Sequence, residues 1–93
     1  MRIDEETKRE YAEFALAVLT QTISPAAYQQ AAADCECSVE DYIENHFLKA
    51  LDEGGFQEAM NLVNEAGNCR DCVKRGRLIT EACNLLRAYL ADH

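Results

Sequence analysis

Apolar residues recur at steps of three and four along most of the chain, a spacing that predicts amphipathic helices rather than strands. The clearest run comprises Val39, Tyr42, Ile43, His46, Phe47, Ala50 and Leu51. Ser38 precedes this run as an N-cap residue with acidic residues in the first turn, and Gly54-Gly55 follows it as a helix stop. We therefore predict a helix from Ser38 to the glycine pair.

Four further helices are predicted from similar patterns and from residues that start or stop helices. Ser24-Pro25 combines an N-cap residue with a proline in the first turn, and Gly67-Asn68 is a common C-terminal stop. The second of the five helices has the smallest apolar face, because small side chains make up most of it. The four further helices are expected at about residues 4–21, 24–35, 56–66 and 70–91.

The connections between these helices are short, so consecutive helices are expected to be antiparallel neighbours. The chain of 93 residues has the size of one domain, with only one Pro and four Gly to interrupt helices. The prediction is an all-α fold, a small bundle of about five antiparallel helices in a single domain, residues 1–93. Tyr42, Phe47 and Phe56 are large side chains for one small bundle, so a homodimer that covers them is an alternative to a monomer.

Acidic residues outnumber basic residues by 17 to nine, which gives a formal net charge of −8. The excess lies in residues 1–60, with 13 Asp/Glu and four Lys/Arg, whereas residues 61–93 carry four and five. The one basic cluster consists of Arg70, Lys74, Arg75 and Arg77. A chain this acidic is repelled by phosphate backbones, so we expect no direct binding of nucleic acid.

The second and third helices also fit the spacing of a helix-turn-helix, with Ala33, Cys37 and Ile43 at offsets that this motif often uses. The helix that would enter the DNA groove, however, carries three carboxylates in its first two turns. Since these carboxylates oppose phosphate, DNA binding is not expected from this motif.

Two pairs of cysteines, Cys35/Cys37 and Cys69/Cys72, lie at the second and fourth connections. In an up-and-down bundle these two connections share one end, where the basic cluster also lies. Zinc binds four thiolate or imidazole ligands in a tetrahedron, and basic side chains offset the negative charge of four thiolates. The spacing therefore predicts a structural Zn²⁺ site with Cys35, Cys37, Cys69 and Cys72 as its ligands.

Two other interpretations of the cysteines stay open. Reduced cysteines pack as small apolar side chains, and Cys35, Cys72 and Cys83 fall on the apolar seams of their helices. Cys37 and Cys69 fall on no seam, so they distinguish metal binding from packing. Alternatively, Cys69 and Cys72 form a redox pair, because a helix N-terminus and basic side chains favour a lowered thiol pKa. No strand pattern accompanies this pair.

The N-terminus lacks the apolar run of a signal peptide, and no stretch reaches the length of a membrane span. We therefore expect a cytoplasmic protein that does not bind membranes, in a reducing compartment where disulfides are rare. No enzyme activity is expected, because His46 lies on a buried seam and no nucleophile stands at a readable spacing from it.

By elimination, the leading function is that of a small acidic interaction or regulatory protein that binds a basic surface of another protein. Glu40, Asp41 and Glu44 on the third helix are the expected contact residues, because complementary charge speeds association. One alternative is an inhibitor that blocks the nucleic-acid-binding groove of its target, as small acidic phage-encoded proteins do. Another is a thiol redox sensor that uses Cys69 and Cys72.

Overall fold

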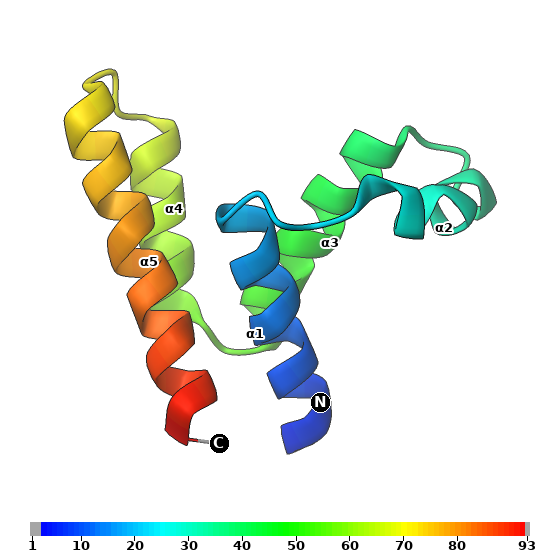
Figure 1. The fold of residues 1–93 in the computed structure, drawn as a ribbon, viewed down its shortest axis with the longest axis horizontal. Coiled ribbons are helices and arrows are strands. Elements are labelled where there is room, and N and C mark those ends of the chain that lie inside the picture. Colours follow the sequence, from blue (N-terminus) through cyan, green and yellow to red (C-terminus); the bar gives the residue numbers. More distant parts are fainter. Residues whose placement is uncertain (1–2, 93) are drawn as a thin grey trace.

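Four long helices run alternately up and down, and each packs against two of the others (Figure 1). The computed structural model describes residues 3–92, and between them no residue lies in a strand. The all-α fold of five helices is therefore confirmed. Its helices are α1 (Glu5–Leu19), α2 (Gln29–Asp34), α3 (Val39–Glu53), α4 (Gln57–Gly67) and α5 (Cys72–Asp92).

The core lies where the four long helices meet, and it is built largely from alanine and leucine. Ala12 and Ala15 of α1 are completely buried, which lets α1 approach α3 and α5 closely. Leu51 and Leu86 are the largest side chains that are fully buried, and they fill the space between the helices. The buried cluster consists of Ala12, Ala15, Phe47, Leu51, Ala59, Ala82 and Leu86.

Helix α3 begins and ends where the sequence predicts. The backbone N–H of Asp41 donates to the side-chain oxygen of Ser38 at 3.1 Å, which satisfies one of the free N–H groups of the first turn. At the other end, a Cβ on Gly54 would lie 2.6 Å from the carbonyl oxygen of Ala50 and 2.6 Å from the ring of Phe56. Only glycine fits there, so the tight turn into α4 depends on it.

The ends of the other long helices agree with the prediction to within two residues, because local contacts determine them. The N–H of Thr7 donates to the carboxylate of Asp4 at 2.7 Å. The N–H of Val73 likewise donates to the carboxylate of Asp71 at 3.0 Å. Both carboxylates cap a helix N-terminus, where negative charge is favourable.

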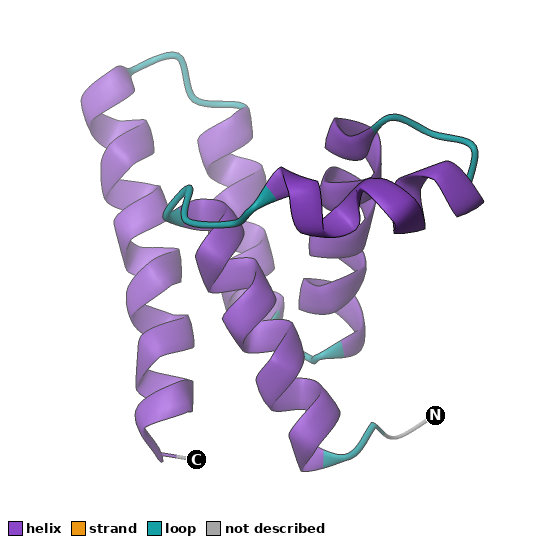
Figure 2. Ribbon diagram, turned by 45° about the vertical axis from the view of Figure 1, so that its right-hand side comes forward, coloured by secondary structure: helices purple, strands orange, loops and turns teal. Residues whose placement is uncertain are grey.

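The second predicted helix differs in the structure from the prediction. It consists of a 3₁₀ turn, Pro25–Tyr28, followed by the six-residue helix α2. Ala32 is the only buried residue of α2, and α2 packs on α3 and the 3₁₀ turn but on no other helix. Figure 2 shows this segment running across α3 rather than alongside the long helices. Its small side chains bury too little apolar surface to hold a full antiparallel helix in the bundle.

The large aromatic side chains that motivated a homodimer are largely covered within one molecule. Phe47 is only 6% exposed and belongs to the core. Phe56 packs edge-to-face on Tyr89 with ring centroids 5.2 Å apart, and the ammonium group of Lys8 lies 5.5 Å from the Phe56 centroid. Phe47 is therefore covered within one molecule, whereas Phe56 and Tyr42 are half-buried, and the homodimer stays a prediction.

None of the helices between residues 3 and 92 combines the length and the apolar character that a membrane span requires.

Candidate functional site

The four cysteines predicted to bind zinc do not come together in the structure. Cys35 and Cys37 lie at the α2–α3 connection, whereas Cys69 and Cys72 lie at the α4–α5 connection. Both connections are at the end of the molecule away from the chain termini, but Figures 1 and 2 show them on opposite sides. In the described part of the chain, no three Cys, His, Asp or Glu side chains form a group that could hold a metal ion.

The physical reason is the shortness of α2. The prediction that the two pairs lie together assumed that a second helix at about residues 24–35 lies antiparallel to its neighbours within the bundle. Because α2 is only six residues long and packs on α3 alone among the helices, it carries Cys35 and Cys37 away from α5. Zinc binding stays a prediction, but the four-cysteine ligand set is not assembled in this fold.

Three cysteines, Cys35, Cys72 and Cys83, were predicted to pack as small apolar side chains, and one of them does. Cys83 is 5% exposed and packs in the interior, as its position on the α5 seam predicts. Cys35 and Cys72 are exposed, so the prediction that packing explains them is wrong. Each stands at the end of a helix, where the seam no longer faces a neighbouring helix. Cys37 and Cys69 are half-buried.

The surroundings of Cys37 favour a protonated thiol. Glu36, which precedes it, has a left-handed backbone with φ of 56° and turns the chain back toward α2. The Cys37 thiol then donates to the carbonyl oxygen of Ala32 at 3.7 Å. Burial raises the pKa of the Cys37 thiol, and the neighbouring Cys35 and Asp41 add to the shift. A raised pKa lowers the fraction of nucleophilic thiolate.

The second pair of cysteines has a different arrangement. The Cys69 thiol donates to the carbonyl oxygen of Asp71 at 3.6 Å. The guanidinium group of Arg75 donates to the backbone carbonyl of Cys69, with its Nε 3.1 Å from that oxygen. Arg75 therefore stabilises the α4–α5 turn through the backbone. The redox prediction for Cys69 and Cys72 is not tested by this geometry.

A surface cavity of about 390 Å³ lies beside the first cysteine pair. Its walls include the ring of His46, which stacks on Tyr42 and packs edge-to-face on Phe14 with ring centroids 4.5 Å apart. Burial lowers the pKa of the His46 imidazole, and the charge of Lys49 lowers it further. The imidazole is thus a neutral packing group near pH 7. The lining residues are Cys35, Cys37, Tyr42, Asn45, His46 and Lys49.

The three predicted partner-binding residues, Glu40, Asp41 and Glu44, are all exposed on α3. Between residues 3 and 92, none of the three carboxylates takes part in a salt bridge. Leu48, one turn after Glu44, is 37% exposed, and Asp52 follows one turn later. Side chains at these four-residue steps share one face of a helix, so a carboxylate lies one turn before and one turn after the exposed Leu48, with Lys49 next to it in sequence.

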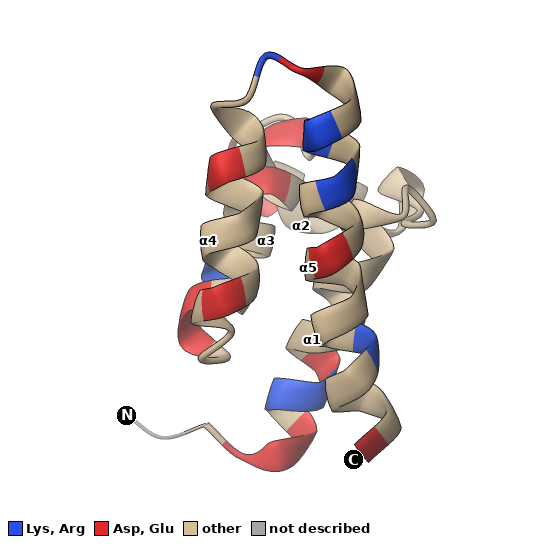
Figure 3. Ribbon diagram, turned by 90° about the vertical axis from the view of Figure 1, so that its left-hand side faces the viewer, with Lys and Arg blue, Asp and Glu red and all other residues tan. Residues whose placement is uncertain are grey.

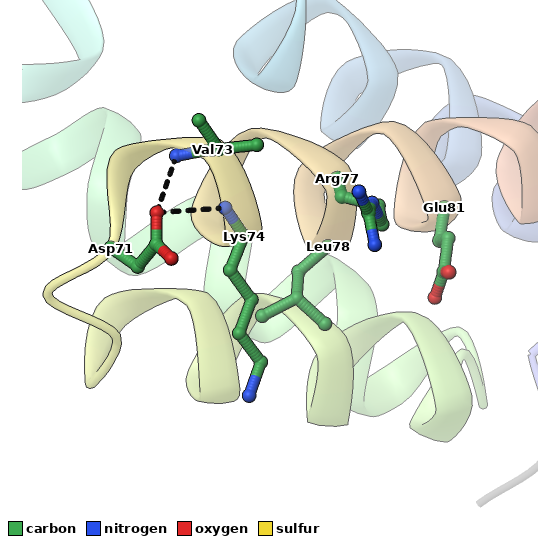
Figure 4. Close-up of a pocket in the computed structure, with 6 residues that line it drawn as sticks. All are labelled: Asp71, Val73, Lys74, Arg77, Leu78 and Glu81. Atoms are coloured by element: carbon green, nitrogen blue, oxygen red, sulfur yellow. Dashed lines mark hydrogen bonds between the residues drawn. The ribbon is translucent and has the colours of Figure 1, made fainter.

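A second charged surface lies on the first turns of α5, where Figure 3 shows Lys and Arg. A cavity of about 410 Å³ opens on this surface, with Leu78 at its base between Lys74 and Arg77 (Figure 4). Val73 beside it is 72% exposed. The cavity is lined by Asp71, Val73, Lys74, Arg77, Leu78 and Glu81.

The two exposed apolar residues were not among the predicted site residues, although the pattern contained a signal for them. Leu48 and Val73 both fall outside the apolar seams of their helices. An apolar residue off the seam is expected to face solvent, and each of these does. Asn45 and Lys49 were not predicted as site residues either, and they stand three and seven residues after Tyr42 and so line the same cavity.

No protein-family model, curated protein or solved structure matches the chain. We therefore infer a function from the side chains on the surface of the molecule. That surface offers carboxylates, basic side chains and two exposed apolar residues, which are groups suited to binding another protein.

Proposed function

We propose that the chain is a small, non-catalytic interaction or regulatory protein that binds a basic surface of another protein through the acidic face of α3. The observation that carries the proposal is the arrangement around Leu48. An exposed apolar side chain is flanked by Glu44 and Asp52, and neither carboxylate takes part in a salt bridge between residues 3 and 92. Protein interfaces often combine an apolar centre with a charged rim.

The charge distribution supports the same proposal. Glu40 and Asp41 extend the acidic face to the start of α3, and Asp34 and Glu36 carry further negative charge at the α2–α3 connection. Complementary charges steer two proteins together before contact, so such a face raises the rate of association more than the final affinity. The proposal assigns these acidic residues to association and gives no catalytic role to His46.

The test is affinity capture from a lysate of the source organism, followed by kinetics with each purified protein that is captured. The variant Glu40→Lys/Asp41→Lys/Glu44→Lys is expected to capture much less than the wild type. For a purified partner, its association rate is expected to fall on the order of tenfold or more. The wild-type association rate should fall as salt is added.

A matched control variant makes the same change in net charge at three carboxylates outside the acidic face. Glu10→Lys/Glu65→Lys/Asp92→Lys alters three exposed carboxylates on α1, α4 and α5. The control should capture partners as the wild type does, and circular dichroism checks that both variants are helical. Equal capture by all three proteins, or an association rate that does not depend on salt, would exclude the acidic face as the binding surface.

A further inference from the structure

Between residues 3 and 92, the exposed large apolar side chains are Leu48 and Val73. Lys49 follows Leu48 and Asp71 lies two residues before Val73, but carboxylates predominate on the α3 face and basic groups on the α5 face. Glu44 and Asp52 lie one helical turn before and after Leu48. Lys74 follows Val73 directly, and Arg77 lies one turn after it. One molecule therefore presents an apolar residue among carboxylates on α3 and another among basic groups on α5.

The face of α5 around Val73 is also open to close approach. Gly76 stands one turn after Val73, and a Cβ at Gly76 would meet nothing within 4 Å. Glycine inside a helix is unfavourable relative to alanine, but its bare backbone lets another chain come close. The adjoining cavity of about 410 Å³ gives room for a side chain next to Val73 (Figure 4).

We propose that the acidic face of α3 binds the basic face of α5 on a second copy of this chain. Leu48 of one molecule packs on Val73 and Gly76 of the next, while its two flanking carboxylates lie against Lys74 and Arg77. The inference rests on the proposed function, because it names a second copy as the protein with the basic surface. Asp71 and Glu81 lie at the two ends of the cavity and repel the acidic face, which confines the contact to Lys74 and Arg77 between them.

The contact is head-to-tail, since its two sides are different surfaces. Helices α3 and α5 are not adjacent in the bundle, because each packs side by side with α1 and α4 (Figures 1 and 2). Each molecule can therefore hold one neighbour through α3 and another through α5, which produces a ring or an open chain. The net charge of −8 opposes the approach of two molecules. At physiological salt the Debye length is about 8 Å, so salt screens this long-range repulsion more than the attraction between charges in contact.

The test is sedimentation velocity over a wide range of protein concentration, with charge reversal on either side of the contact. One variant is Glu44→Lys/Asp52→Lys on α3, and the other is Lys74→Glu/Arg77→Glu on α5. Wild-type protein is expected to self-associate as concentration rises, and each variant alone to associate on the order of tenfold or more weakly. An equimolar mixture of the two variants regains association, because each supplies the surface that the other has lost.

Recovery in the mixture also shows that both variants are folded. Wild-type protein that stays monomeric at millimolar concentration overturns the proposal, as do variants that associate as the wild type does or a mixture that does not recover. Failure here is distinct from failure of the proposed function. A monomeric wild type that still captures another protein through Glu40, Asp41 and Glu44 refutes only the second copy as the partner.

Discussion

The ring of His46 lies parallel to the ring of Tyr42 in an offset stack, with centroids 5.8 Å apart and planes inclined by only 7°. His46 also packs edge-to-face on Phe14 and Tyr11 of α1, so one imidazole links α1 to α3. This position was predicted from the apolar seam of α3. It makes His46 a packing group whose charge state affects stability.

The substitution His46→Phe is expected to make the stability of the protein less dependent on pH. Burial and Lys49 lower the pKa of His46 in the folded protein below its usual 6.5, so the unfolded chain binds the proton more readily. The free energy of unfolding of the wild type should therefore fall as the pH drops below 6.5. Phenylalanine keeps an aromatic ring and does not titrate.

Urea denaturation at about pH 8 and about pH 5.5 measures this effect. The stability difference between His46→Phe and the wild type should shift in favour of the variant at the lower pH. A difference that is the same at both pH values would show that folding does not change the pKa of His46.

Replacing Gly54 by alanine is expected to destabilise the protein by about 1–3 kcal/mol. The new Cβ would clash with the Ala50 carbonyl oxygen, which is backbone, and with the Phe56 ring. Gly67→Ala is the matched control, because a Cβ there meets nothing within 4 Å and alanine favours the helix by up to about 1 kcal/mol. Chemical denaturation of both variants should show opposite signs, and a neutral Gly54→Ala would contradict the tight turn.

Truncating Leu51 to alanine should cost about 2–5 kcal/mol, because its side chain is fully buried between the long helices. Leu48→Ala on the same helix is the control, since a side chain that is 37% exposed loses much less contact. Its effect should stay near 0.5 kcal/mol, roughly the range of surface substitutions. Thermal denaturation compares the two variants, and equal losses would contradict the assignment of Leu51 to the core.

Removing metal is expected to leave the fold unchanged. In the described residues no three ligand-type side chains form a metal-holding group, and helix packing holds the bundle together. Circular dichroism and the melting temperature should therefore be the same with and without a chelator. Native mass spectrometry that found one zinc lost on chelation, together with unfolding, would restore the four-cysteine site.

The reaction of the cysteines with a thiol reagent gives an independent check on their positions. Cys35 and Cys72 are exposed and should react first in the native protein. Cys83 is buried and should react only after denaturation. Mass spectrometry of the labelled peptides identifies the order, and early labelling of Cys83 would contradict its place in the interior.

Most helices of this protein could be predicted because their determinants are local. Ser38, Asp4 and Asp71 each accept hydrogen bonds from backbone N–H groups within three residues, and Gly54 closes α3. The apolar steps of α3 likewise predicted that Phe47, Ala50 and Leu51 are buried. These signals lie within one or two turns of the residues that they affect, so reading along the chain is sufficient.

The placement of the cysteines could not be predicted in this way. Whether Cys35 and Cys37 meet Cys69 and Cys72 depends on where α2 packs, and that depends on how much apolar surface it buries against α3. The exposure of Cys35 and Cys72 has the same origin, because a residue on a seam is buried only where a neighbouring helix extends far enough to cover it.

The sequence by itself thus determined the four long helices, their ends to within two residues, the core face of α3 and the excess of negative charge in residues 1–60. Only the tertiary structure decided that the two cysteine pairs lie on opposite sides. The exposure of Leu48 and Val73, by contrast, agrees with their positions outside the apolar seams of their helices. The physical reason is that capping and helical periodicity are short-range, whereas the position of a side chain relative to distant residues follows from the packing of whole helices.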